Sequence, residues 1–153
     1  LIRLGGPADH MNNRVQKFTQ DGGFLASFGC LGNGRGELDR PSGVTVDPDG
    51  DVYICDWSNE RVQVFAPDGR FITTLRGDVT QLSHWAQMNV SANPDAAKRR
   101  REVKNPEIEW RFSLPVTVLF DSDNDRLIVA DTQRQRLQIY NKPKDYAIPT
   151  RTL

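Results

Sequence analysis

The chain contains the stretch Asn59-Glu60-Arg61-Val62-Gln63-Val64-Phe65-Ala66-Pro67-Asp68-Gly69-Arg70-Phe71 and repeats it on both sides. The upstream copy keeps the same register from Asn12 to Phe24, and a shorter downstream copy reads Arg134-Gln135-Arg136-Leu137-Gln138-Ile139-Tyr140. A repeat of this period indicates stacked copies of one supersecondary unit. The repeat therefore predicts the architecture before any single motif is considered.

The middle copy is complete and predicts four short strands without a helix. Apolar residues alternate along each run, and Pro48-Asp49-Gly50 and Pro67-Asp68-Gly69 are strong reverse-turn signals between runs. The expected strands are Pro41–Asp47, Asp51–Asp56, Arg61–Phe65 and Phe71–Leu75. Four strands joined by tight turns are typical of one blade of a β-propeller. The predicted fold is all-β, a partial propeller of four-stranded antiparallel blades.

The flanking copies are incomplete. The first begins at its third strand, so we expect its first two strands to be absent. The last copy has three expected strands, and a fourth is not evident in the sequence that runs into Tyr146. Closed propellers have about four to eight blades, so residues 1–153 read as a partial propeller with repeats at about 12–29, 36–77 and 112–142. We expect further blades of a parent chain, or another subunit, to close the ring.

The period is broken once, by an insertion at 78–111. Its composition is charged and partly helical: Asn93-Pro94 is typical of a cap followed by proline at the first helical position, and Ala96 to Lys104 suits a helix. Insertions in repeat proteins map to loops on one face, often the binding face. The insertion is therefore the first place to look for function.

The repeated residues resemble NHL repeats. The resemblance rests on a proline-led first strand ending in Asp, an Asp-Gly turn, an Asp at the end of the second strand, and an Asn-x-Arg-Val-Gln-Val-Phe third strand. In the complete copy these are Pro41, Gly43, Asp47, Asp49, Gly50, Asp56, Asn59, Arg61, Val62, Gln63, Phe65, Asp68 and Gly69. The resemblance implies a six-bladed propeller, usually a protein- or RNA-binding platform and sometimes an enzyme scaffold. The sequence departs from the family at Asn13, Glu60 and Gln135, where a histidine is usual.

Two Asp–Arg pairs recur at a five-residue spacing, Asp56 with Arg61 and Asp131 with Arg136. A charged-ligand clamp is one interpretation. The other is a bidentate pair that ties adjacent strands within each blade. We favour the structural interpretation, because a scaffold pair is needed once per blade whereas a catalytic group is needed once.

Candidate partner-binding residues lie in the insertion and in one turn. Lys98-Arg99-Arg100-Arg101 is the main basic run and could meet phosphates, although a solvated helix with internal ion pairs is the simpler interpretation. Trp57 follows a predicted strand, and we expect it either to contact a partner or to pack against Arg61. Trp85, in the insertion, is a further candidate contact.

We expect no metal, cofactor or catalytic site in this chain. His10 and His84 both fall outside the repeat strands, and no spaced set of His and Cys supplies zinc ligands. The run Asp121–Asp125 resembles a calcium loop superficially but reads as a turn between strands. The glycine-rich run Gly29–Gly36 lacks the ending of a phosphate loop and reads as a connection between blades.

The composition further narrows the classes of function that the chain can have. The 20 Lys and Arg balance the 20 Asp and Glu, so no overall field draws the chain to nucleic acid. No apolar run approaches the length of about 18 residues that spans a membrane. The two cysteines, Cys30 and Cys55, lie in unlike settings, and we do not expect them to form a disulfide.

The sequence thus predicts a non-catalytic NHL scaffold that binds a protein partner through blade loops and the insertion. RNA binding through the basic run is a second candidate. The alternative is a fragment of a metal-dependent propeller enzyme, of amidating-lyase or lactonase type, whose active residues lie in blades outside this chain.

Overall fold

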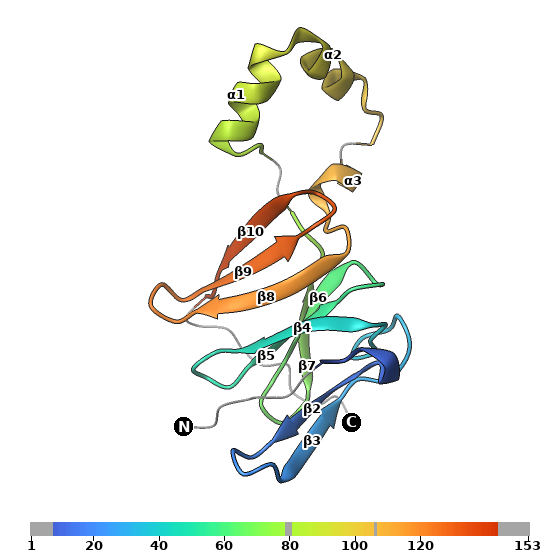
Figure 1. The fold of residues 1–153 in the computed structure, drawn as a ribbon, viewed down its shortest axis with the longest axis vertical. Coiled ribbons are helices and arrows are strands. Elements are labelled where there is room, and N and C mark those ends of the chain that lie inside the picture. The colour runs from blue at the N-terminus through green and yellow to red at the C-terminus, as the bar shows by residue number, and fades with distance from the viewer. Residues whose placement is uncertain (1–7, 79–80, 106, 144–153) are drawn as a thin grey trace. The chain divides into compact units, whose positions relative to one another are not determined.

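The computed structural model describes residues 8–78, 81–105 and 107–143. It divides into two compact units: a β unit, Leu1–Arg76 with Phe112–Leu153, and a helical unit, Gly77–Arg111. The β unit contains three antiparallel sheets, two of three strands and one of four (Figure 1). The mostly-β fold predicted from the sequence is therefore confirmed.

The second sheet is the complete one and has the strand order β4-β5-β6-β7. Its strands are β4 Pro41–Val46, β5 Val52–Asp56, β6 Arg61–Phe65 and β7 Phe71–Leu75. Gly50 (φ 91°) and Gly69 (φ 87°) take left-handed conformations in the two outer turns, which residues with a side chain rarely adopt. Each turn residue predicted from the sequence thus has a backbone reason for its position.

The first sheet contains one strand more than expected. Its strands are β1 Ala8–Asp9, β2 Arg14–Phe18 and β3 Phe24–Phe28, with a 3-10 turn, η1 His10–Asn12, between the first two. Ala8 pairs with Val15, so β1 takes the place of the second strand of the repeat. The expectation that the first two strands of this copy are absent was wrong for the second of them, because two residues are enough to pair with β2.

The third sheet has the order β10-β9-β8, with β8 Pro115–Asp121, β9 Arg126–Asp131 and β10 Arg136–Asn141. Residues 122–125 form the turn between β8 and β9, as the sequence predicted for the aspartate-rich run. The sequence in which a fourth strand was sought, up to Tyr146, lies outside the described residues.

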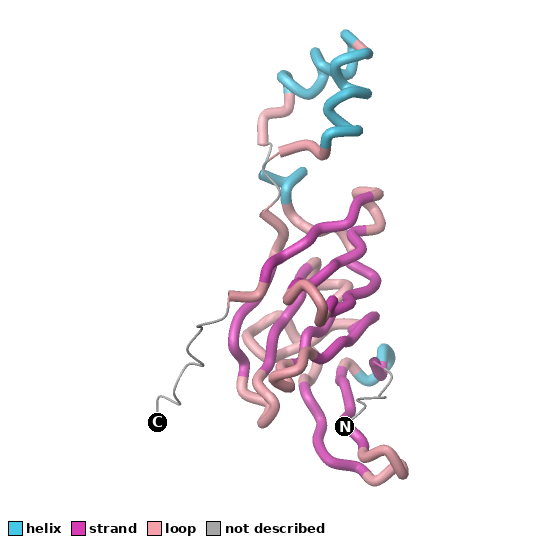
Figure 2. Tube along the Cα trace, turned by 90° about the vertical axis from the view of Figure 1, so that its left-hand side faces the viewer, coloured by secondary structure: helices cyan, strands magenta, loops and turns pink. Residues whose placement is uncertain are grey.

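Two apolar clusters hold the three sheets of the β unit together, and Figure 2 shows the strands of this unit gathered beside one another. The cluster between the first and second sheets contains Val15, Phe28, Leu38, Val52, Ile54 and Phe65. The cluster between the second and third contains Tyr53, Cys55, Val62, Val64, Phe112, Val118, Phe120, Leu127 and Val129. Burial of both faces of the middle sheet explains why β5 is apolar on both sides.

Gly43 sets how closely β4 and β8 approach. A Cβ atom at Gly43 would lie 2.9 Å from the Cα of Thr117 and 3.0 Å from the backbone oxygen of Val116. Both are backbone atoms, so no side-chain rotation could relieve the contact. Glycine is therefore required for the packing of the inner strands.

The helical unit contains α1 His84–Ala92, α2 Pro94–Glu102 and α3 Glu107–Trp110. The Asn93 side chain accepts hydrogen bonds from the N–H groups of Asp95 and Ala96, so α2 begins at Pro94, with the cap and first helical position that the sequence predicted. None of the described helices is long and apolar enough to cross a membrane.

Candidate functional site

The repeated polar residues meet at one end of the second sheet, around the buried carboxylate of Asp56. Its oxygens accept hydrogen bonds from the backbone N–H of Asp39 (2.7 Å), from Asn59 Nδ2 (2.9 and 3.0 Å), from Arg61 Nε (2.7 Å) and from Gln63 Nε2 (3.1 Å). Asp56 is fully buried and Arg61 is 3% exposed. Every partner is supplied by the protein itself, so this carboxylate has a structural environment.

The guanidinium of Arg61 extends the same network into the glycine-rich connection. Its Nη1 donates to the backbone oxygen of Asn33 (2.8 Å), and its Nη2 donates to those of Gly34 and Glu37 (both 2.9 Å). Gln63 also donates to the Glu37 oxygen. The repeat motif therefore fixes the chain that leads from one sheet to the next.

The third sheet repeats this arrangement. Asp131 accepts from Arg136 Nε (2.8 Å), Gln138 Nε2 (3.3 Å) and the backbone N–H of Ser113 (2.7 Å). Ser113 is equivalent to Asp39 of the second sheet, because each lies two residues before the proline that begins the first strand, Pro115 or Pro41. The two sequence-predicted pairs thus have the same geometry in two sheets.

The first sheet carries a more exposed version. Arg14 Nε lies 3.1 Å from Asp9 Oδ2, with side-chain exposures of 42% and 25%. Hydrogen bonds from Asn12 and then from Arg14 hold the pKa of Asp9 below its usual value. The same Asp–Arg pair therefore occurs with three different degrees of burial in one chain.

A left-handed residue precedes the arginine in every copy. Asn13, Glu60 and Gln135, which depart from the usual histidine, have φ values of 53°, 52° and 50°. This conformation is uncommon for residues with a side chain and makes the turn before the third strand tight. The position is therefore selected by backbone geometry.

Trp57 lies in that turn of the second sheet and is half-buried. Its ring centroid is 6.2 Å from that of His10, at an interplanar angle of 56°. The structure thus places His10 next to Trp57, a contact the sequence did not predict. The partner-binding role of Trp57 stays a prediction.

Helix α1 of the helical unit is uncharged and exposed. From His84 to Ala92 it contains no Asp, Glu, Lys or Arg, and it begins with the Ser83 side chain accepting from the Ala86 N–H. Trp85 is 73% exposed and Met88, one turn on, is 51% exposed. The apolar side chains of α1 therefore form an outward stripe.

Helix α2 carries the basic run. Lys98, Arg99, Arg100 and Arg101 are all exposed. Arg100 Nη1 lies 3.5 Å from Glu109 Oε2, a long and half-exposed ion pair that contributes little stability. Among the described side chains, the ion pairing expected by the simpler interpretation is thus found for Arg100.

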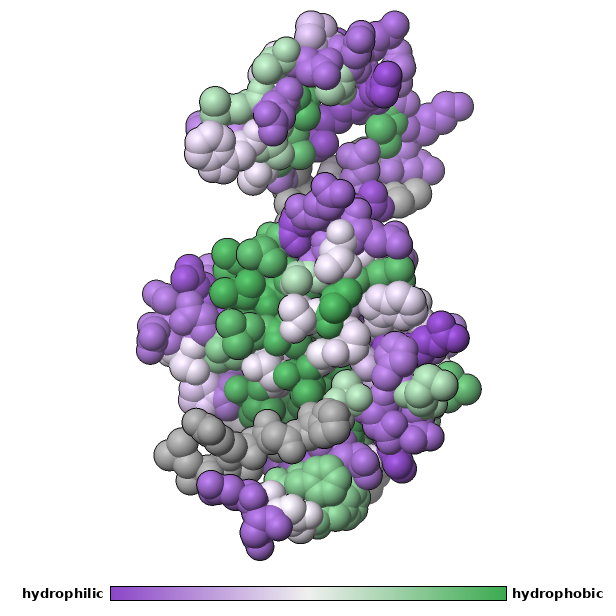
Figure 3. All heavy atoms as spheres, viewed as in Figure 1, coloured by the Kyte–Doolittle hydropathy of each residue, from purple (hydrophilic) through white to green (hydrophobic). Residues whose placement is uncertain are grey.

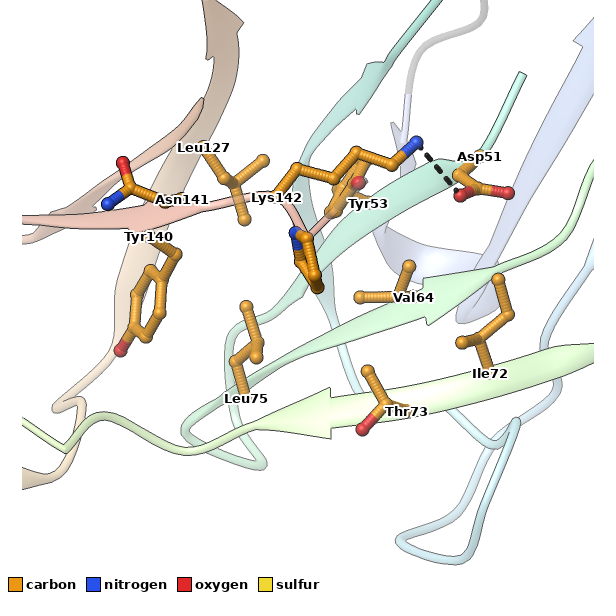
Figure 4. Close-up of a pocket in the computed structure, with 11 residues that line it drawn as sticks. Asp51, Tyr53, Val64, Ile72, Thr73, Leu75, Leu127, Tyr140, Asn141 and Lys142 are labelled. Carbon is orange, nitrogen blue, oxygen red and sulfur yellow. Dashed lines mark hydrogen bonds and ion pairs between the residues drawn. The ribbon is translucent and has the colours of Figure 1, made fainter. Parts of the chain in front are cut away.

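A cavity of about 370 Å³ lies between the second and third sheets (Figure 4). Its walls are mainly apolar, from Tyr53, Val64, Ile72, Leu75, Leu127 and Tyr140, and its rim includes Asp51, Thr73, Asn141, Lys142 and Pro143. Figure 4 shows Lys142 reaching over Tyr53 toward Asp51. This cavity was not predicted from the sequence, because its walls come from different repeats.

Lys142 closes one end of that cavity through three aspartates. Its Nζ pairs with Asp47, with Asp49 (2.7 Å) and with Asp51 (3.3 Å). Burial alone would lower the pKa of Lys142, but hydrogen bonds to Asp47 and Asp49 outweigh it and the pKa is raised. Burial and the neighbouring Asp47 raise the pKa of Asp51. Lys142 therefore ties the third sheet to the second.

Tyr53 shares the same acidic turn. Its hydroxyl donates to Asp47 Oδ2 at 2.8 Å, and burial followed by this hydrogen bond raises the pKa of the phenol. Asp47 in turn accepts the backbone N–H groups of Asp49 and Asp51, both at 3.0 Å. The aspartates predicted as turn residues are thus also the anchor for Lys142. No cluster of three His, Cys, Asp or Glu that could hold a metal ion occurs within residues 8–78, 81–105 and 107–143.

With this geometry in place, the comparisons are specific. The model of the NHL repeat family matches residues 38–65, which cover the loop end, β4, β5 and β6 around Asp56. Residues 38–65 thus match one NHL repeat. The resemblance drawn from the sequence is confirmed, and the network around Asp56 is the polar framework of that repeat.

Curated relatives match about a third of the chain. Protein lin-41 of Caenorhabditis elegans is 51% identical over 51 residues, 33% of this chain and 4% of that protein. The E3 ubiquitin-protein ligase TRIM71 of Mus musculus is 53% identical over 45 residues, 29% and 5%. The human NHL repeat-containing protein 3 is 40% identical over 58 residues, 38% and 17%. The chain spans between 4% and 17% of the length of these relatives.

Among solved structures, a putative phosphatase from Bacteroides thetaiotaomicron aligns with a TM-score of 0.50 and 15% identity, over 89% of this chain and 32% of that one. At this identity the likeness concerns the fold alone. The three sheets are β-propeller blades, as the NHL repeat predicted.

Proposed function

We propose that this NHL chain is part of a β-propeller that acts as a binding scaffold for a protein partner, with the helical unit as its contact element. The repeated Asp, Asn, Arg and Gln side chains satisfy one another and the backbone, so they stabilise the sheet ends. The observation that supports a protein partner is helix α1.

The composition of α1 is that of an interface core. Interface cores are depleted of charged residues and enriched in Trp and Met. Helix α1 has no charged residue, and it exposes Trp85 and Met88 one turn apart, where they can enter an apolar groove of a partner as neighbouring anchors. A helix that faced only water would carry charges on that stripe.

The test is to replace side chains in the full-length parent protein. Trp85→Ala and Met88→Ala should each weaken binding of the parent's partners by roughly tenfold or more, since truncated hot-spot residues cost at least about 2 kcal/mol. Gln87→Ala, also exposed on α1, is the matched control and should bind normally. Equal binding by all three variants would remove α1 from the interface.

The whole insertion can be tested in the same assay. Its ends are held in the β unit by a hydrogen bond from the Phe112 N–H to the Arg76 oxygen at 2.8 Å. A short Gly-Ser bridge from Arg76 to Phe112 should therefore preserve the sheets. Unchanged binding after this replacement would assign recognition to the blade loops instead.

RNA is a second candidate ligand, supported by exposed Lys98, Arg99 and Arg101 on α2. Phosphate contacts release counterions, so RNA affinity through these residues should fall steeply with added salt. Affinity that is insensitive to salt, or to charge removal at these three positions, would exclude this use of α2.

The third sheet supports a further structural proposal. Val62 and Val64 of β6 are buried against the third sheet, whereas Leu137 and Ile139, at the same positions of β10, are 65% and 55% exposed. Figure 3 shows apolar atoms gathered over this sheet. We infer that a further four-stranded sheet, from the parent chain or another subunit, covers this face. Leu137→Glu should then weaken assembly of the complete propeller, while a normally assembled variant would contradict the inference.

Metal analysis of the full-length parent protein separates the scaffold from the enzyme alternative. A stoichiometric metal in the parent would favour a lyase- or lactonase-type enzyme. A metal-free parent that retains partner binding would favour the scaffold.

A further inference from the structure

A second hollow, of about 470 Å³, lies beside the outer strand of the second sheet. It is lined by the glycine-rich connection, by β7 and by three arginines, Arg35, Arg61 and Arg76. None of the described residues that line it is acidic. The hollow lies within the β unit, and Ile72 and Thr73 of β7 stand between it and the apolar cavity near Lys142, lining both.

The three arginines have different states. Arg61 is buried, and its charge is balanced by Asp56 at 2.7 Å. Arg35 and Arg76 are exposed, and neither forms an ion pair with any residue that the structure describes. Glu37, the acid of the same connection, accepts the Gly34 N–H at 2.7 Å. The hollow thus presents two exposed guanidinium groups that have no acidic partner among the described residues.

Two arginines at one polar hollow favour a phosphate group. A guanidinium presents a planar fork of N–H donors that matches phosphate oxygens, and charge-assisted bonds of this type are about twice as strong as neutral ones. Thr74 of β7, which pairs with Gln63 of β6 and lies on the same face of the sheet as Arg61, also lines the hollow and supplies a hydroxyl donor. These donors suit a dianionic phosphate ester better than a single carboxylate.

The source of the phosphate is indicated by what surrounds the hollow. Single-stranded nucleic acid requires a continuous basic track and aromatic faces for its bases. Among the described residues of the lining, Phe71 is the one aromatic, and its ring already packs edge-on against that of Phe65, with 6.2 Å between the ring centroids. The chain as a whole has no net charge. The hollow therefore accommodates an isolated phosphate.

The strand next to the hollow suits a peptide. β7 is the last strand in the order β4-β5-β6-β7, so its outer edge has no strand partner in the described part of the chain. An exposed edge of this kind can pair with an extended peptide through backbone hydrogen bonds. A peptide along β7 would pass beside the hollow that Arg76 and Arg35 line.

We propose that Arg35 and Arg76 bind the phosphate of a phosphorylated serine or threonine in an extended segment of a protein partner, which pairs with the edge of β7. This deepens the proposed function by naming a chemical feature of the partner. It uses the β unit and does not depend on α1.

The test is a titration of the full chain, labelled with ¹⁵N, with a glycine-flanked phosphoserine peptide and with its unphosphorylated twin. The phosphopeptide should shift the Nε–Hε signals of Arg35 and Arg76 and the amide signals of β7, and it should bind at least tenfold more tightly than the twin. Arg35→Gln and Arg76→Gln should each reduce its affinity about tenfold, because a hydrogen bond to a charged group contributes about 1.5–3 kcal/mol.

Arg70→Gln is the matched control, since Arg70 precedes β7 and pairs with Asp68 at 2.7 Å outside the hollow. It should bind the phosphopeptide as the parent chain does. Equal affinity for the two peptides, or equal loss in all three variants, would overturn the proposal. A short uridine oligonucleotide that binds more tightly than the phosphopeptide, and depends on Arg35 and Arg76, would replace the peptide by RNA. The outcome of this titration does not depend on the binding test of the α1 variants, because the hollow lies in the β unit.

Discussion

The three copies of the Asp–Arg pair form a natural series in which one substitution should have three different effects. Asp→Asn at position 56, 131 or 9 removes the carboxylate charge and preserves its size. The exposed fractions of the Asp and Arg side chains are 0% and 4% for Asp56 with Arg61, 0% and 23% for Asp131 with Arg136, and 25% and 42% for Asp9 with Arg14. The loss in unfolding free energy should therefore be largest for Asp56→Asn, smaller for Asp131→Asn and smallest for Asp9→Asn.

The expected magnitudes come from the burial of the arginine that is left behind. Removing one partner of a buried pair costs about 3–5 kcal/mol, because the remaining charge has no counter-ion, and this applies to Asp56→Asn. Arg136 is partly hydrated, so Asp131→Asn should cost about 1–3 kcal/mol. The pair at Asp9 is exposed on both sides, and its loss should not change stability measurably.

Urea unfolding followed by far-UV circular dichroism measures the three effects on one scale. The midpoint should fall most for Asp56→Asn and least for Asp9→Asn, with the same slope if the denatured states are alike. An Asp56 variant that does not fold, beside a normally folded Asp9 variant, satisfies the same order. Equal shifts at the three positions would show that burial does not determine the strength of this motif.

Three other predictions follow from single positions. Lys142→Met should lower the free energy of unfolding by about 3–5 kcal/mol, since buried carboxylates lose their counter-ion. The pKa of Lys142 in the folded chain is raised above 10.5. The difference in unfolding free energy between variant and parent should therefore be complete below pH 10.5 and disappear as the pH rises through the folded pKa. Gly43→Ala should cost about 1–3 kcal/mol in urea unfolding, because its Cβ meets backbone that cannot rotate away, and an unchanged midpoint would contradict the close approach of β4 and β8. A thiol reagent should modify exposed Cys30 in the folded chain and Cys55 only after unfolding, since burial raises the pKa of Cys55 to about 12; equal rates would contradict that burial.

Much of the fold was predictable because its signals are local. Proline-led strands, Asp-Gly turns and the period of the Arg-Val-Gln run determine strand number and order within each sheet. The absence of a Cys30–Cys55 disulfide also followed from their settings, and both thiols are free. The two-residue strand β1 was missed, because so short a run has no periodicity to detect.

The sites formed between repeats were not predictable in the same way. Lys142 stands beyond the last recognisable strand, and nothing near it in sequence indicates that it reaches Asp47 and Asp51. Arg35 and Arg76 are distant in sequence, and the glycine-rich connection was read only as a spacer. The repeated Arg61 could have indicated the hollow, because its hydrogen bonds to backbone oxygens hold the glycine-rich connection against the second sheet.

The closure of the insertion at Arg76 and Phe112 has an entropic consequence. Because the sheets already hold these two residues together, the free energy of closing the loop depends only weakly on its length, about 0.6 kcal/mol for each doubling. The insertion can therefore lengthen, shorten or exchange its helices at little cost to the blades. The position between Arg76 and Phe112 is thus a site where new recognition sequences can be accepted without a new scaffold.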